Sequence, residues 1–147
     1  MIRNAKAEDA SRIAEILIFA KRLNYRSIFQ NDTVSFGKMQ VYPLAKDYIC
    51  HPEKLEKIFV YDDGFVKGMI HIDGTQIVEL YVDPFFESQG IGSSLLEYGI
   101  EQRNCDCLWV LEKNAKAIRF YQRHRFAITE EKQLEEGTTE YIVQMKR

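Results

Sequence analysis

The fold of this chain is decided by residues 77–102, IVELYVDPFFESQGIGSSLLEYGIEQ. Ile77–Val82 is a β-branched and aromatic run, which predicts a strand that ends at Asp83-Pro84. Downstream, Leu95, Leu96, Gly99 and Ile100 recur at helical spacing and predict the buried stripe of a helix. Cys107–Leu111 is nearly continuously apolar and predicts a second strand, so we expect this region to form a βαβ crossover.

The loop before the predicted helix carries two glycines, Gly90 and Gly92. The first turn of a helix presents backbone N–H groups without intrahelical partners, together with the positive end of the helix dipole. Glycines remove side chains from that approach, so a pyrophosphate can contact the backbone directly. The hydroxyls of Ser93 and Ser94 would add donors. The loop therefore suits an anion.

Two nucleotide-binding motifs and a plain helix cap compete with this interpretation of the loop. Leu95 occupies the third glycine position of a dinucleotide-binding fingerprint, although Glu112 lies near the acidic position of that motif. No Gly-Lys-Ser/Thr follows to make a Walker loop. A glycine-tolerant helix cap without any ligand accounts for Gly90 and Gly92 equally well.

The rest of the chain predicts helices and strands on both sides of this region. A short strand comes first, followed by a helix to about Tyr25 whose apolar residues are Ile13, Ile16, Leu17, Ala20 and Leu23. The further elements are a helix with Val41, Leu44, Ala45 and Tyr48 inward, strands at 58–61 and 66–72, a helix at 115–123, and strands near 126–129 and 139–145. The order βααβββαβαββ indicates a single α/β (α+β) domain over residues 1–147, with a mixed, largely antiparallel central sheet flanked by helices.

Composition excludes several classes of partner. The length of 147 residues suits one domain, and a net charge of -2 without a lysine and arginine run argues against nucleic acid. The amino terminus lacks an apolar signal and no segment reaches the length of a membrane span, so we expect a cytoplasmic protein. Cys105-Asp106-Cys107 lacks the spacing of a zinc site, so with Cys50 we expect free thiols and no metal. The oligomeric state is left open, a homodimer included.

Two blocks of sequence resemble a known family. Leu80–Pro84 followed by Glu87–Leu96 looks like motif A of the GNAT superfamily of N-acetyltransferases. Asn114–Phe126 resembles motif B, in which an Asn opens a helix and a Tyr precedes its end. The order of elements that periodicity predicts is also the order that this family implies. Together the resemblance spans nearly the whole chain.

The resemblance implies acetyl-CoA as cosubstrate and an amine as acceptor. It assigns the pantetheine arm to Tyr81, Val82 and Asn114, and the pyrophosphate to Gln89, Gly90, Ile91, Gly92, Ser93 and Ser94. Two residues depart from the family pattern: Glu87, where Gln or Arg is usual, and Arg125, where Gly is usual. Because an acid beside a pyrophosphate is repelled, we expect Glu87 to turn to solvent. Lys116, Arg119 and Arg123 can meet the adenosine 3′-phosphate or form a solvated basic face.

Acetyl transfer needs a group that takes a proton from the amine and one that gives a proton to the departing thiolate. Tyr121 stands in the position of the family's usual general acid, although packing on the inward helix face explains it too. Glu79 points away from the face that we expect Val78, Leu80 and Val82 to bury. Glu79 is therefore a candidate base, or else a solvent-facing residue or a cross-strand partner of Lys67 or His71. His71 is a weaker candidate base.

The acceptor pocket is expected between the first two helices, where Tyr25, Phe29, Phe36 and Tyr42 are substrate-binding candidates and core packing is the competing explanation. The cysteines lack an evident histidine partner, so direct transfer without a covalent intermediate is expected. The alternative is a non-catalytic module of the same fold that senses acyl-CoA or binds a partner protein.

Overall fold

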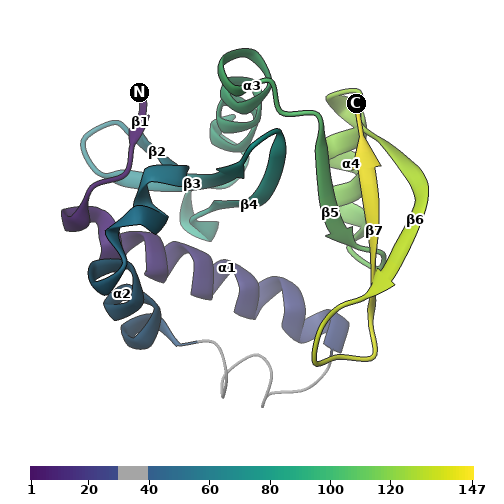
Figure 1. Cartoon of the computed structure of the whole chain (residues 1–147), viewed down its shortest axis with the longest axis horizontal. Coiled ribbons are helices and arrows are strands. Elements are labelled where there is room, and N and C mark those ends of the chain that lie inside the picture. Colours follow the sequence, from purple (N-terminus) through teal and green to yellow (C-terminus); the bar gives the residue numbers. More distant parts are fainter. Residues whose placement is uncertain (30–39) are drawn as a thin grey trace.

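The computed structural model describes residues 1–29 and 40–147, with the side chains of residues 24–29 outside the described part. Its elements are β1 (Ile2–Asn4), η1 (Ala7–Asp9), α1 (Ala10–Phe29), α2 (Val41–Cys50), η3 (Pro52–Lys57), β2 (Ile58–Asp62), β3 (Val66–Asp73), β4 (Gln76–Val82), η4 (Pro84–Phe86), α3 (Ile91–Arg103), β5 (Cys107–Leu111), α4 (Ala115–Arg123), β6 (Ala127–Leu134) and β7 (Tyr141–Lys146). The predicted order βααβββαβαββ is confirmed (Figure 1).

The strands form one seven-stranded sheet in the order β1-β2-β3-β4-β5-β7-β6. Every neighbouring pair is antiparallel except β4 and β5, which are parallel and joined by the crossover helix α3. None of the helices in the described ranges is both long and apolar enough to cross a membrane. The predicted fold class, a mixed and largely antiparallel sheet with flanking helices, is confirmed.

Helices cover both faces of the sheet, so β3 is buried on both sides. Met69 lies in the core with α1 and α2, whereas Ile70 lies in the core with α3, and both are 0% exposed. A Cβ on Gly68 would lie 3.0 Å from Leu95 Cδ1 and 3.2 Å from the Tyr81 carbonyl oxygen. Only glycine lets α3 approach the sheet this closely.

Three local predictions differ from the structure. Helix α1 extends beyond Tyr25 to Phe29, and Leu23 is 64% exposed rather than buried. The reason is that α1 runs on past β4, where no sheet lies over its last turns (Figure 1). Val78, which was expected to be buried, is 41% exposed, because β4 and β5 stop pairing at Ile77, the residue before it.

The start of α1 depends on a buried carboxylate. Both terminal nitrogens of Arg3 donate to Asp9, at 2.8 and 3.0 Å, and the Lys6 backbone N–H donates at 2.8 Å. The hydrogen bond from Arg3 outweighs burial and lowers the pKa of the Asp9 carboxyl. Asp9 thus ties β1 to the first turn of the helical region.

We expect Asp9→Asn to lower the free energy of unfolding by about 1–3 kcal/mol at pH 7, because it breaks charged, partly buried hydrogen bonds. A carboxyl whose pKa is lowered by folding stabilises the folded state. This stabilisation is complete above the pKa of the unfolded chain, about 3.9, and is lost as the pH falls through the lower pKa of the folded state. Denaturant unfolding should therefore show wild type and variant converging below about pH 4. Glu8→Gln, an exposed neighbour, is the control; equal losses in both variants would contradict the assignment.

Candidate active site

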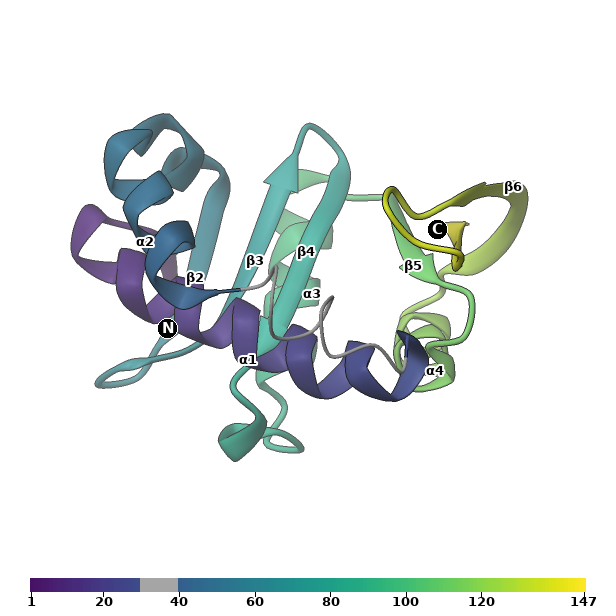
Figure 2. The same ribbon diagram turned by 90° about the horizontal axis from the view of Figure 1, so that it is seen from below.

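The site begins where β4 and β5 separate. The two strands pair only at Gln76 with Cys107 and at Ile77 with Leu108. On its other edge β4 pairs His71 with Glu79 and Ile72 with Ile77, so Val78 is an extra residue that bends the strand. Beyond these pairs the strands diverge, as Figures 1 and 2 show. The carboxyl ends of two parallel strands thus enclose an opening, the usual place for a ligand in α/β sheets.

A cavity of about 560 Å³ occupies this opening. Its walls come from β4, the β4–α3 loop, the start of α3, β5 and α4, together with Ala20 and Lys21 of α1, Glu135, and Ile142 of β7. The cavity therefore lies between the diverging strands, with residues of α1 and of the start of α3 in its lining.

The N-terminus of α3 closes one end of the cavity. Gly90 has a φ of 81°, in the left-handed region, and the first helical bond runs from Ser94 N–H to the Gly90 carbonyl oxygen at 3.0 Å. The N–H groups of Ile91, Gly92 and Ser93 precede this bond and lie at the open end of the helix. Ser93 Oγ lies 3.3 Å from His124 Nε2. This end of the cavity suits an anion.

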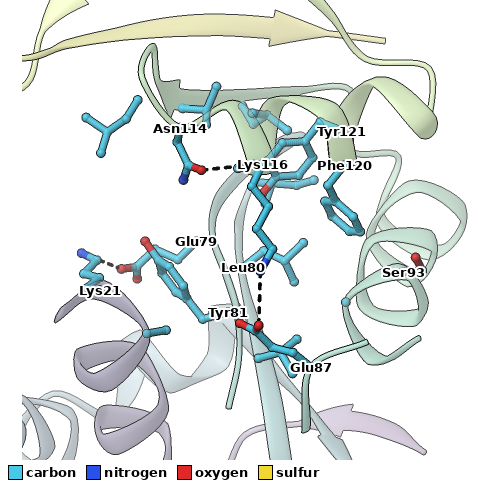
Figure 3. A pocket seen from close by; sticks show the side chains of 18 of the residues that line it. Lys21, Glu79, Leu80, Tyr81, Glu87, Ser93, Asn114, Lys116, Phe120 and Tyr121 are labelled. Carbon is cyan, nitrogen blue, oxygen red and sulfur yellow. Dashed lines mark hydrogen bonds and ion pairs between the residues drawn. The ribbon is translucent and has the colours of Figure 1, made fainter. Parts of the chain in front are cut away.

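Helix α4 supplies the wall opposite β4. The Asn114 side chain accepts a hydrogen bond from the Ala117 N–H at 3.2 Å and so caps the helix, while Asn114 also lines the cavity. Phe120 and Tyr121 extend from α4 toward β4 (Figure 3). The Tyr121 ring packs edge-on against Phe120 and Phe126, with centroids 5.2 and 6.0 Å away. These contacts hold its ring orientation.

Glu79, on β4, places a carboxylate in the lining of the cavity. Its oxygens lie 3.3 Å from His71 Nδ1 and 3.4 Å from Lys21 Nζ, and its side chain is only 19% exposed. Burial raises the pKa of Glu79, but the hydrogen bond with His71 and the charge of Lys21 outweigh it, so the pKa lies below its ordinary value. The cross-strand pairing with His71 is confirmed, whereas Lys67 binds Asp63 instead, at 2.9 Å.

Glu87 is exposed, as expected, with 41% of its side chain accessible, and it also forms an ion pair. Its carboxylate lies 3.2 Å from Lys116 Nζ, across the cavity between the β4–α3 loop and α4 (Figure 3). The other departure, Arg125, has a φ of 71°. Because a left-handed conformation costs an L-residue roughly 1–2 kcal/mol, the backbone at Arg125 favours the glycine that the family usually has there.

The sequence of the site region identifies the family. Residues 54–128 match the model of the acetyltransferase (GNAT) domain. The chain is a GNAT acetyltransferase.

Relatives agree with this assignment. The peptidyl-lysine N-acetyltransferase YjaB of Salmonella typhimurium is 24% identical over 128 residues, which are 87% of this chain and 83% of that protein. The structure of the PaiA N-acetyltransferase from Thermoplasma acidophilum in complex with coenzyme A has a TM-score of 0.72 at 18% identity, over 100% and 98% of the two chains. That of yncA from Salmonella typhimurium with its cofactor acetyl-CoA has a TM-score of 0.69 at 19% identity, over 100% and 92%.

The GNAT fold brings most of the predicted site residues to one cavity. Its lining includes Glu79, Tyr81, Val82, Gly90, Ile91, Gly92, Ser93, Asn114 and Tyr121. Gln89 and Ser94 are not among the lining residues, and the Ser94 hydroxyl donates instead to the Gly90 carbonyl oxygen at 3.0 Å. Phe36 and the side chains of Tyr25 and Phe29 lie outside the described part of the chain.

Sequence reasoning missed two groups of this acetyltransferase site. Lys21 belongs to the first helix, and nothing in its spacing links it to a strand residue 58 positions later. His124 lies inside the motif B block, but only the packing of α4 against the start of α3 brings it to Ser93. Both contacts are tertiary and leave no periodic signal.

We expect Gly90→Ala to weaken coenzyme A binding, because alanine resists the positive φ that opens the helix end. The strain should also cost roughly 1–2 kcal/mol of unfolding free energy. Gly74→Ala is the matched control, since Gly74 has a φ of 63° in the β3–β4 turn and, as at Gly90, an added Cβ would have no neighbour within 4 Å. Calorimetric titration should show weaker binding only for Gly90→Ala; an equal loss in the control would refute a role for this loop.

Proposed function

We propose that this enzyme transfers the acetyl group of acetyl-CoA directly to a primary amine. One observation carries the proposal: a single cavity joins an anion-binding helix end, the Tyr121 phenol and the Glu79 carboxylate. The family membership and the coenzyme A complexes of similar structures support acetyl-CoA as the donor.

The donor's arm fits the opening between the strands. β4 keeps its pairing with β3 along Leu80, Tyr81 and Val82, but β5 no longer pairs with the other edge of these residues. An extended ligand that carries amide groups can take that edge as an added strand would. The pyrophosphate then reaches the start of α3, and the thioester lies near Glu79 and Tyr121.

The chemistry follows from the groups around the thioester. The amine nitrogen attacks the carbonyl carbon, and backbone N–H groups of β4 stabilise the developing oxyanion. As the C–S bond breaks, the Tyr121 hydroxyl donates its proton to the sulfur; a phenol of reference pKa about 10 suits a thiolate whose thiol has a pKa of about 8.5. The proton lost from the new amide nitrogen restores the phenol. Glu79 faces the incoming ammonium.

A direct route also fits the positions of the cysteines. Cys105 is buried, and Cys107 donates a weak hydrogen bond to the Thr75 carbonyl oxygen at 3.8 Å. Burial raises the pKa of Cys105 to about 11, which leaves it protonated and a poor nucleophile at neutral pH. None of the three cysteines is among the residues that line the cavity.

Release of free thiol from acetyl-CoA tests the proposal. The relative YjaB is named a peptidyl-lysine N-acetyltransferase, so the first acceptor to test is a lysine-containing peptide. A peptide whose only amine is at its N-terminus and an aminoglycoside are tested in parallel. A protein that binds coenzyme A but releases no thiol above background with any of them would favour the alternative, an acyl-CoA sensor.

Tyr121→Phe removes the proposed acid and keeps the ring packing. We expect kcat to fall about 100-fold, within the usual range for general acid catalysis, while the Kd for coenzyme A changes little. Tyr98→Phe is the control, because Tyr98 stacks on Phe59 and does not line the cavity. Steady-state kinetics and titration separate the two quantities, and full activity of Tyr121→Phe would show the acid assignment to be wrong.

Glu87→Gln removes a negative charge beside the bound phosphates and releases Lys116 to meet them. We expect coenzyme A to bind roughly two- to fivefold more tightly, in line with the small free energy of an exposed ion pair. The gain should shrink at high salt. Glu97→Gln, an exposed acid on α3, is the control, and weaker binding by Glu87→Gln would contradict this role.

A further inference from the structure

Glu79 lies between two cavities. The second cavity, of about 390 Å³, lies between α2, η3 and the ends of β2, β3 and β4. Glu79 lines both cavities, whereas His71 lines only the second one. The side chains of Glu79 and His71 therefore connect the proposed acetyl-transfer site with the second cavity.

Register holds these two side chains together. His71 and Glu79 are direct partners in the antiparallel ladder of β3 and β4, so their side chains leave the sheet on the same face. Glu79 Oε1 lies 3.3 Å from His71 Nδ1, and Oε2 lies 3.4 Å from Lys21 Nζ. Because Nδ1 faces the carboxylate, the other ring nitrogen, Nε2, is turned away from it. His71 therefore has one nitrogen at Glu79 and one available to the second cavity.

We propose that Glu79 and His71 form a relay that carries the proton of the acceptor ammonium into the second cavity. The relay rests on the proposed function. An ammonium N–H bond breaks as the proton moves to a Glu79 oxygen, which leaves the nitrogen lone pair to attack the thioester. With the neutral imidazole in the tautomer that carries its proton on Nε2, the new carboxyl O–H gives its proton to the bare Nδ1 of His71, and the proton on Nε2 passes to water in the second cavity. One proton enters and one leaves.

Glu79 alone is poorly suited to keep this proton. Burial raises the pKa of the Glu79 carboxyl, but the hydrogen bond with His71 and the charge of Lys21 lower it below its ordinary value, so the ionised carboxylate is favoured. An imidazole nitrogen is a stronger base than a carboxylate. His71 is thus a positioning and proton-accepting residue that acts through Glu79, without contact with the substrate.

The other charges around His71 are mostly paired with one another. The titratable groups that face it are Lys21 of α1, Asp47 and Tyr48 of α2, Glu53, Lys54 and Lys57 of η3, Asp73 of β3 and Glu79 of β4. Lys54 binds Asp47 at 2.6 Å and Lys57 binds Asp73 at 3.2 Å. Glu79 is the charged group in direct contact with His71, so a proton on the Glu79 carboxyl can pass to that ring.

His71→Asn tests the relay, because the amide can keep a hydrogen bond to Glu79 but cannot carry a proton. With acetyl-CoA and the lysine-containing peptide, we expect kcat at neutral pH to fall roughly 10- to 100-fold, with the Kd for coenzyme A unchanged. The pH profile of kcat should also differ from that of the wild type. In His71→Ala, added imidazole should restore part of kcat, since the second cavity has room for it. His51→Asn is the control, because the His51 side chain lines neither cavity and does not contact Glu79; its ion-pair partner is Asp47, 3.0 Å away.

The outcomes distinguish the relay from the proposed function. Wild-type protein that binds coenzyme A and releases no thiol would overturn both. Active wild type together with a His71→Asn variant of unchanged kcat and pH profile would overturn the relay alone, and would leave His71 a purely structural partner of Glu79. Loss of kcat with a changed pH profile and imidazole rescue would support the relay.

Discussion

β4 and β5 share only two residue pairs, and the rest of the molecule is arranged around their early separation. The extra residue Val78 bends β4 away, α3 crosses over from one strand to the other, and α1 passes beneath the gap. In a regular sheet the backbone N–H and C=O groups along this edge of β4 would hydrogen-bond to β5. Here they lie at the edge of the cavity instead. The donor site is therefore a property of strand geometry, and the side chains around it adjust charge and proton transfer.

Charge in this site is balanced by short-range pairs rather than by an excess of one sign. Near the N-terminus of α3, Glu87 forms an ion pair with Lys116. Elsewhere in the cavity, Glu79 interacts with both Lys21 and His71. Each pair has to be rearranged or shared when a charged reactant arrives. In the proposed reaction, phosphates would compete with Glu87 for Lys116, and the acceptor ammonium would compete with Lys21 and His71 for Glu79.

The elements were predictable because they follow local periodicity. The glycines and hydroxyls at the start of α3 pointed to a candidate site there, and Gly90, Gly92 and Ser93 do line the cavity. What could not be predicted depends on tertiary geometry. Val78 belongs to an apolar run and looks buried, yet the bend in β4 exposes it. In the sequence, nothing distinguishes Lys21 and Glu87 from ordinary surface charges. In the structure, both line the cavity, where Lys21 of α1 pairs with Glu79 and Glu87 pairs with Lys116 of α4. The left-handed backbone at Arg125 is likewise invisible in the sequence alone.

The short seam between β4 and β5 also has a mechanical consequence. With two ladder pairs between them, β1 to β4 and β5 to β7 are two half-sheets joined mainly by that seam and by α3. In the proposed binding mode, a cofactor arm between the strands would take the place of the missing ladder bonds and so connect the two half-sheets. A ligand that binds only the folded state stabilises it by mass action, so cofactor concentration and resistance to unfolding would be linked. On this proposal the two half-sheets would separate most easily when the donor is scarce.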